Sequence, residues 1–244
     1  MPEGPSILLM KESLQKFTGE KVLATSGNAK VEKSVLIGKT LEEIRTFGKQ
    51  TYLIFGEISV RVHLLMFGSY SVDEQIRPDK SLRLCLRFSS GEIYFYTCSV
   101  KLVDAEFLKE IPWEADVLSD EWNPVSAETK LKNQGDEMVC DALLDQDIFS
   151  GVGNIIKNEV LFRIKVHPET LLKNLSDEKL HELIAEARNY SFDFLEWKRN
   201  YVLKKNWLVH NKSICPDCGG KLTRKHTGIR HRRSFFCEKD QLLY

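Results

Sequence analysis

The stretch LLDQDIFSGVGNIIKNEVLFRIKVHP, residues 143–168, decides how the second half of this chain folds. Apolar residues recur at helical spacing on both sides of Gly151 and Gly153, which predicts one helix over Asp136–Phe149 and another over Asn154–Ile164. Glycines between two helical patterns mark a sharp turn, and Asn154 is a suitable N-cap for the second helix. The stretch therefore predicts two helices joined by a tight turn.

The same turn has the features of a phosphate-binding site. Glycines let a ligand approach the backbone closely, and the free N–H groups and dipole of a helix N-terminus favour a phosphate. A plain helix–helix turn with an asparagine cap explains the same short pattern. On these residues alone the plain turn is the simpler interpretation.

The first half of the chain shows the two-residue alternation of β-strands. In KSLRLCLRFSSGEIYFYTC (80–98), alternating apolar residues on both sides of a turn at Ser89–Gly91 predict a hairpin with one buried face. Residues 51–55 and 60–67 predict two further strands, and residues 5–17 predict a helix that precedes them. We therefore expect residues 1–118 to form a β-sandwich or flattened barrel with a leading helix.

The polar, proline-containing stretch SDEWNPVS, residues 119–126, predicts a linker to a helical domain over residues 127–207. Its last helix is expected from about Asp177 to Asn200, with Ser176 as N-cap. Residues 208–244 hold too little apolar material to fold without an additional constraint. The predicted fold class is α+β, with an N-terminal sandwich, a C-terminal helical domain and a terminal hairpin.

Grouped cysteines supply that constraint. Two residues separate Cys215 from Cys218, and Cys237 follows with Asp240 where a fourth cysteine would stand, which is the spacing of a zinc hairpin. We expect a structural Zn²⁺ held by these four residues and no organic cofactor. His226 or His231 could replace Asp240, and a hairpin without metal could instead be held by packing of Phe235 and Phe236.

Composition bounds the partners and the compartment. The chain is 42% hydrophobic and 29% charged, as in ordinary globular proteins, and it lacks a secretory signal or a membrane-spanning apolar run. We therefore expect a cytoplasmic protein, associated with the nucleoid in a bacterium. Residues 201–244 carry ten Lys or Arg and three Asp or Glu in a chain of zero formal net charge. This basic segment favours a polyanionic partner, although a solvated charged face is the simpler interpretation of charge alone.

Taken together, these motifs resemble the formamidopyrimidine-DNA glycosylase and endonuclease VIII family over nearly the whole chain. Five stretches carry the resemblance in order: MPEGP at residues 1–5, FGKQTYLIF at 47–55, VHLLMFG at 62–68, the helical stretch at 143–168, and WLVHNKSICPDCGG with RRSFFCEKDQ in the hairpin. Residues 127–207 would then be the family's helix–two-turn–helix domain. The resemblance implies a monomeric base excision repair enzyme that acts on damaged double-stranded DNA.

The resemblance also assigns roles to single residues. After removal of Met1, Pro2 would attack C1′ of the damaged nucleotide through its secondary amine, with Glu3 as the acid. An iminium on Pro2 would then drive β- and δ-elimination, which makes the enzyme a glycosylase and an AP lyase. The DNA phosphates would be contacted by Lys49, Asn154 and Arg232, with Arg233 as the alternative to Arg232. An apolar wedge would fill the space of the flipped base, and it would consist of Leu65, Met66 and Phe67.

Two departures affect the expected substrate. The guanine-lesion branch carries a second wedge loop, DPRRFG, where this chain has YTCSVKLVD at 96–104, and a long loop over the flipped base also lacks a counterpart. Both departures favour oxidised pyrimidines and the endonuclease VIII branch. They also leave open a DNA-binding protein that keeps the scaffold without catalysis. A tautomerase using Pro2 is disfavoured by the basic hairpin.

Overall fold

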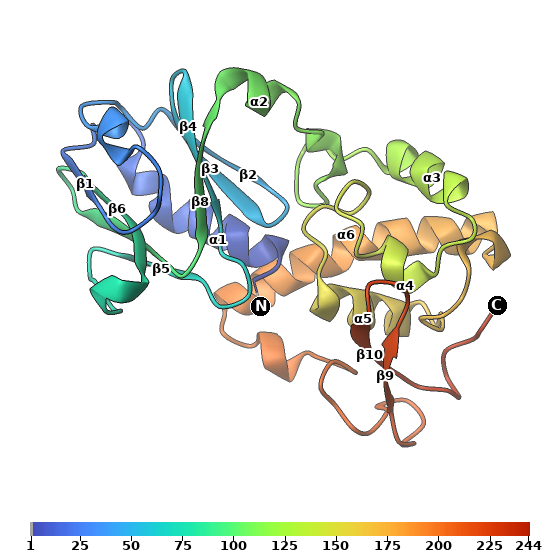
Figure 1. Cartoon of the computed structure of the whole chain (residues 1–244). Coiled ribbons are helices and arrows are strands. Elements are labelled where there is room, and N and C mark those ends of the chain that lie inside the picture. Colours follow the sequence, from blue (N-terminus) through green and yellow to red (C-terminus); the bar gives the residue numbers. More distant parts are fainter. Residues whose placement is uncertain (1) are drawn as a thin grey trace. The chain divides into compact units, whose positions relative to one another are not determined.

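A computed structural model describes residues 2–244, which divide into two compact units, residues 1–111 and 112–244 (Figure 1). The first unit contains two four-stranded antiparallel sheets, with strand orders β1-β6-β7-β5 and β2-β3-β4-β8. Its strands are β1 (Ala24–Ser26), β2 (Glu43–Phe47), β3 (Gln50–Phe55), β4 (Ile58–His63), β5 (Ser69–Val72), β6 (Leu82–Arg87), β7 (Glu92–Tyr96) and β8 (Ser99–Asp104). Its helices are α1 (Gly4–Leu14) and α2 (Ala105–Lys109), with short 3₁₀ turns at Gln15–Phe17, Lys33–Leu36 and Asp79–Ser81.

The sandwich forms because the alternating apolar residues of both sheets face one core. In the β6–β7 hairpin Leu84 pairs with Phe95 and Leu86 with Ile93, and all four side chains are fully buried. Helix α1 adds the buried side chains Ile7, Met10 and Leu14 to the same core. The predicted α+β class and the N-terminal sandwich with a leading helix are confirmed.

The strand predicted over residues 60–67 ends earlier, at His63. The amide of Gly68 donates to the carbonyl of Leu64 at 2.8 Å, and Leu65 has a φ of 57°, so the chain turns sharply there. A left-handed residue cannot continue a pleated strand. The four residues after His63 therefore form a loop instead of extending the sheet.

The second unit is mainly helical. It contains α3 (Pro124–Asn133), α4 (Val139–Ala142), α5 (Asn154–Arg163) and α6 (Asp177–Arg199), with 3₁₀ turns at Trp113–Ala115, Leu172–Asn174 and Leu203–Lys205, and the strands β9 (Thr223–Thr227) and β10 (Arg232–Phe236). The predicted helices over 154–164 and 177–200 are present. The helix predicted over 136–149 is wrong, because only α4 is an α-helix there. Side chains after α4 bind nearby backbone instead, as when the Asp145 carboxylate accepts the amide of Asp147 at 2.9 Å.

Helix α3 starts inside the stretch predicted as a linker. The side chain of Asn123 accepts hydrogen bonds from the amides of Val125 and Ser126 at 3.0 and 3.1 Å, and Pro124 occupies the first helical position. An asparagine cap followed by proline is a strong helix start. None of the helices formed within residues 2–244 combines the length and apolar character needed to span a bilayer.

The long helix α6 provides a test of local stability. Ser176 Oγ accepts the amide of Lys179 at 3.2 Å. We expect Ser176→Ala to lower the free energy of unfolding by about 1 kcal/mol, because one amide of the first turn loses its partner. Ser176→Asp keeps a capping oxygen and should retain the wild-type value. Urea denaturation measures both, and equal losses in the two variants would contradict the capping role.

Candidate nucleic-acid interface and metal cluster

The start of the first unit is fixed by Glu3. Its backbone is extended, with φ −120° and ψ 170°, and its carbonyl accepts the amide of Ser6 at 2.8 Å as the N-cap of α1. The Glu3 side chain is fully buried, whereas Pro2 is half-buried. Glu3 thus starts α1 through its backbone, directly after Pro2, while its side chain is enclosed within the first unit.

Lys49 lies at the tip of the β2–β3 hairpin. Phe47 pairs with Gln50, so Gly48 and Lys49 form a two-residue turn, and Gly48 has the positive φ of 54° that such a turn favours. Burial, together with the positive charges of Lys49 and Arg61, holds the pKa of His63 below its usual range. The charge of Lys49 therefore acts at the end of β4, where the next loop begins.

His63 fastens that loop, a role that the sequence did not indicate. Its Nδ1 accepts the amide of Leu65 at 3.0 Å, which requires an unprotonated Nδ1. A side chain that accepts the amide two residues later stabilises a local turn. The lowered pKa favours the neutral ring that can make this bond.

The predicted wedge residues Leu65, Met66 and Phe67 project from the loop. Their exposed fractions are 50%, 54% and 73%, so they do not continue a strand into the core. A Cβ on Gly68 would lie 2.0 Å from the carbonyl oxygen of Leu64, so only glycine fits the base of this loop. The loop therefore exposes three large apolar side chains, and a tight turn closes its base.

In the second unit, Asn154 connects α5 with the terminal hairpin. It is the first residue of α5 and Gly153 is the N-cap, so the prediction of Asn154 as N-cap is wrong by one position. Its Nδ2 donates to the carbonyl of Arg233 at 3.0 Å, while its Oδ1 lies buried without a hydrogen-bond partner in the structure of residues 2–244. The side-chain amide of Asn154 thus connects the N-terminus of α5 to strand β10.

The next turn of α5 binds the same strand through buried polar groups. Lys157 is fully buried, and its ammonium donates to Ser234 Oγ at 2.7 Å. Asn158 accepts the amide of Phe235 at 3.3 Å. Side chains alternate along a strand, so Arg232 shares a face with Ser234 and Arg233 points to the other face. Arg232 thus shares the face of Ser234, which binds Lys157, whereas Arg233 shares the face of Phe235, which clusters with Phe162 of α5.

Asp141 of α4 holds the tip of the hairpin, a role that no sequence pattern indicated. Its carboxylate is buried and accepts the amides of Ile229 and Arg230 at 2.9 and 3.0 Å. Gly228 has a φ of 67°, and a Cβ there would lie 2.0 Å from Asp141 Oδ2. The tip is thus fixed by a close approach that only glycine allows, directly before Arg232.

The four predicted metal ligands come together at the base of the hairpin. Ligand atoms of Cys215, Cys218, Cys237 and Asp240 all lie within 4.8 Å of one another, and neither His226 nor His231 belongs to this cluster. Cys218 Sγ and Cys237 Sγ are 3.5 Å apart, close to the ~3.8 Å that two thiolates on one tetrahedral zinc would show. The donor set therefore fits a metal ion with Asp240 as the fourth ligand.

The protonation of the cluster follows from burial and hydrogen bonds. Burial, with a further contribution from the Asp240 carboxylate, raises the pKa of Cys237 to about 12. Hydrogen bonds from Cys215, Cys218 and Cys237 lower the pKa of Asp240 to about 2. A cation that binds here must displace thiol protons, so its affinity depends on pH.

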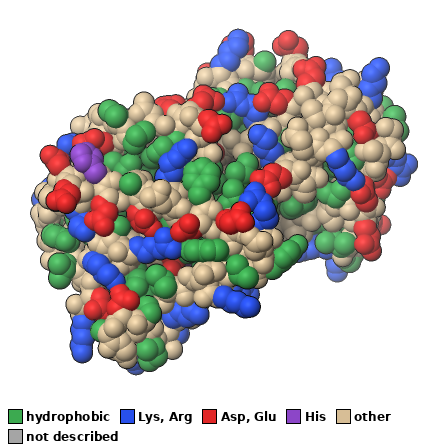
Figure 2. Space-filling view, turned by 180° about the vertical axis from the view of Figure 1, so that it is seen from behind, with side chains coloured by type: hydrophobic (Ala, Val, Ile, Leu, Met, Phe, Trp, Pro, Cys, Tyr) green, Lys and Arg blue, Asp and Glu red, His purple; other side chains and the backbone are tan. Residues whose placement is uncertain are grey.

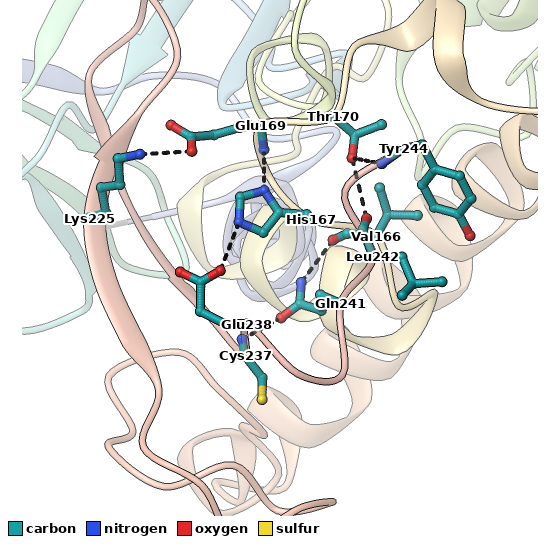
Figure 3. A network of polar contacts seen from close by, with 10 residues as sticks. All are labelled: Val166, His167, Glu169, Thr170, Lys225, Cys237, Glu238, Gln241, Leu242 and Tyr244. Carbon is teal, nitrogen blue, oxygen red and sulfur yellow. Dashed lines mark hydrogen bonds and ion pairs between the residues drawn. The ribbon is translucent and has the colours of Figure 1, made fainter.

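The segment that carries Cys237 and Asp240 is also fastened to the loop after α5 (Figure 3). Gln241 accepts the amide of Cys237 at 2.9 Å and donates to the carbonyl of Val166 at 2.8 Å. The ring of His167 lies 3.6 Å from the carboxylate of Glu238. These contacts involve no ion, and they attach residues 237–241, the segment that carries Cys237 and Asp240, to the loop after α5.

The charges outside the hairpin are mixed in sign. On the face shown in Figure 2, Lys and Arg side chains are interspersed with Asp and Glu. In the hairpin, by contrast, six of the thirteen residues of 221–233 are Lys or Arg and none is acidic. The terminal hairpin is therefore a local concentration of positive charge on a neutral chain.

Comparison with known proteins gives matches over both units. Residues 1–102 match the formamidopyrimidine-DNA glycosylase N-terminal domain, and residues 114–191 match the H2TH domain of formamidopyrimidine-DNA glycosylase. The chain is 33% identical over 207 residues to endonuclease 8-like 3 of Mus musculus, which covers 82% of this chain and 34% of the relative. It is 28% identical over 200 residues to endonuclease 8 2 of Mycobacterium bovis, which covers 78% of this chain and 77% of that protein.

Solved structures share the fold. A viral DNA glycosylase superimposes with a TM-score of 0.86 at 22% identity, covering 98% of this chain and all of the other. The formamidopyrimidine-DNA glycosylase of Lactococcus lactis, in a structure non-covalently bound to DNA containing an AP site, gives 0.85 at 20% identity and covers 98% of this chain and 99% of its own. The chain belongs to the formamidopyrimidine-DNA glycosylase and endonuclease VIII family. It spans about a third of the length of the vertebrate endonuclease 8-like 3 proteins.

The Asp141 contact predicts a local change in the hairpin. In Asp141→Asn an amide nitrogen must face one of the two backbone donors, so we expect the amides of Ile229 and Arg230 to exchange hydrogen at least about tenfold faster, because a bond to a charged group contributes ~1.5–3 kcal/mol. Hydrogen–deuterium exchange measures this. Asp147→Asn removes the same charge from the same segment and should leave both amides unchanged. Unchanged exchange in Asp141→Asn would show that the carboxylate does not hold the tip.

Proposed function

We propose that this chain is a DNA glycosylase of base excision repair that also has AP lyase activity, acting on damaged double-stranded DNA. The observation that carries the proposal is the match of both family domains in their family order, with Pro2, Lys49 and Asn154 each at a fixed local feature of the fold. Base removal needs a nucleophile such as a secondary amine, and phosphate binding needs groups such as a lysine on a turn or the N-terminus of a helix.

Pro2 is the proposed nucleophile once Met1 has been removed. An α-amino group titrates near pH ~8, so a useful fraction of it is unprotonated at neutral pH. The nitrogen lone pair attacks C1′, the bond from C1′ to the base breaks, and the base leaves with a proton. The proline nitrogen then loses its proton, and its lone pair expels O4′, which takes a proton as the sugar ring opens. The resulting iminium acidifies C2′, and elimination of the 3′ and then the 5′ phosphate cuts the strand.

Glu3 is the proposed acid of this reaction. As the N-cap of α1 it stands next to Pro2, and its carboxyl group is buried. A carboxyl group held in that position can protonate the sugar oxygen or the departing base. Because the same backbone feature starts the helix and orients Glu3, the chain places nucleophile and acid with a single structural element.

Three residues are proposed to position the DNA backbone. Lys49 lies at a hairpin tip, Asn154 stands at the first turn of α5, and Arg232 shares the face of β10 that carries Ser234. Phosphate contacts of this kind fix the register of a protein on DNA without reading its sequence. Arg233 remains the alternative to Arg232.

The wedge loop supplies the means to flip a base. Leu65, Met66 and Phe67 are large, apolar and at least half exposed on a closed loop. Apolar side chains inserted between base steps unstack DNA and occupy the space of the extruded nucleotide.

The preference that we propose is for oxidised pyrimidines. Where the guanine-lesion branch has its second wedge loop, β7 and β8 are joined by Thr97 and Cys98 alone, and β8 pairs along its length with β4. The residues of that loop are thus replaced by the short β7–β8 connection and by β8, the edge strand of the β2-β3-β4-β8 sheet. All three wedge side chains then come from one loop, as in the endonuclease VIII branch.

Borohydride trapping tests the chemistry. We expect the full chain, processed to begin at Pro2, to form a covalent adduct with duplex DNA containing an abasic site or 5-hydroxyuracil, because borohydride reduces the iminium. A protein extended at its N-terminus should lose trapping, and proteolytic removal of that extension back to Pro2 should restore it. Gel electrophoresis of labelled DNA measures the adduct.

Two results would contradict the mechanism or the activity. Full strand cleavage by the extended protein would exclude Pro2 as nucleophile. DNA binding without any adduct in the processed wild type would instead indicate a DNA-binding protein on this scaffold.

Zinc is the proposed occupant of the cluster, in a structural role, because three thiolates and one carboxylate suit its tetrahedral preference. We expect about one zinc per chain by elemental analysis, a lower content in Asp240→Ala, and retention in Asp240→Cys. Affinity should weaken as pH falls, since protons compete for thiols whose pKa is raised. Zinc content near zero in the wild type would contradict the assignment.

A further inference from the structure

The end of helix α6 holds a residue that its backbone disfavours. The amide of Tyr201 donates to the carbonyl of Lys198 at 3.1 Å, and the amide of Val202 donates to that of Trp197 at 2.8 Å. These two bonds define a Schellman ending, in which the residue at the position of Tyr201 is left-handed and most often glycine. Tyr201 has a φ of 60° there. A bulky side chain in this conformation costs free energy, because its Cβ crowds the following carbonyl oxygen.

Packing does not offset that cost. The exposed fraction of Tyr201 is 95%, the highest among the exposed large hydrophobic side chains of residues 2–244. A tyrosine that contributes to stability buries its ring. The ring is therefore held outward, in a strained backbone conformation, where it does not add to the core.

The surroundings of the ring are strongly basic. Between Lys198 and Lys205 four of eight residues are Lys or Arg and none is acidic. Lys204 and Lys205 are exposed on the turn that follows. The neighbouring acid, Glu196, is engaged by Arg199 at 2.7 Å and accepts from Asn200 at 2.6 Å, so it does not neutralise the lysines that flank Tyr201 in the sequence.

We propose that Tyr201, with Lys204 and Lys205, forms a binding site for an unpaired nucleotide of a single DNA strand. The base stacks on the exposed ring, and the lysines bind the flanking phosphates. An aromatic ring beside cations is the arrangement that non-specific single-strand binding uses. A base inside a duplex has both faces stacked already, so the ring selects unpaired bases. The proposal rests on the proposed function only in taking DNA as the polyanion.

Substitution of Tyr201 tests the site, because glycine is the residue that its backbone prefers. We expect Tyr201→Gly to keep or raise the melting temperature of the full chain, yet to weaken binding of a fluorescein-labelled oligothymidine by about 5- to 150-fold, the range for loss of one stacked base. Tyr201→Phe keeps the ring and should bind as the wild type. An undamaged blunt duplex should lose little affinity in either variant. Fluorescence anisotropy measures all three.

The lysines are tested by the salt dependence of the same binding. Lys204→Ala with Lys205→Ala should reduce the slope of log affinity against log salt by about 1.4, because each phosphate contact to a single strand contributes ~0.7. Tyr201→Gly should leave the slope nearly unchanged, since stacking releases no counterions. A change of slope in Tyr201→Gly would show that the substitution acts on charge instead.

Three results would overturn the proposal. The first is an unchanged affinity of Tyr201→Gly for oligothymidine. The second is an equal loss of affinity for duplex and for single-stranded DNA in that variant. The third is a Tyr201-dependent binding to anionic lipid vesicles that exceeds the binding to the oligonucleotide. Borohydride trapping of wild type and Tyr201→Gly on damaged duplex separates the two proposals. Trapping with unchanged oligothymidine affinity defeats this site alone, whereas absence of trapping in the wild type defeats the glycosylase assignment alone.

Discussion

The buried ammonium of Lys157 is the interaction on which the position of the terminal hairpin in the second unit depends. A fully buried positive charge is stable only where polar groups surround it, and Ser234 of the terminal hairpin supplies one of them at 2.7 Å. The same helix binds β10 through Asn154 and Asn158. The hairpin cannot slide along α5 without leaving polar groups buried and unpaired, which costs more than a lost surface contact. Its position is therefore well determined.

Much of the fold could be predicted because its signals are local. The alternation in β6 and β7, the cap at Ser176 and the three-turn apolar pattern of α5 are all read within a few residues, and each element was found close to its bounds. The errors fell where distant contacts override a local pattern. The carboxylate of Asp141 binds the amides of Ile229 and Arg230 in the terminal hairpin, and the expected helix ends at Ala142.

The candidate site divides in the same way. Residues that stand in short recognisable motifs, such as the cysteines with Asp240 or the wedge loop, were found from the sequence, and the structure brings the four ligand residues together. Asp141 was missed because its partners, Ile229 and Arg230, follow it by 88 and 89 residues. The contact of His63 is local, but a single histidine at the end of a strand has the same sequence pattern whether or not its ring binds the loop that follows.

The contacts of Gln241 and His167 give the metal cluster a second means of support. Two attachments with different chemistry, one set of ligands and one set of hydrogen bonds, hold the same short segment. Loss of an ion would then loosen the base of the hairpin while the tip stays fixed by Asp141 and the middle by α5. In a cell under oxidative stress, where thiols are the first groups to react, such redundancy would let the protein tolerate damage to its own cysteines.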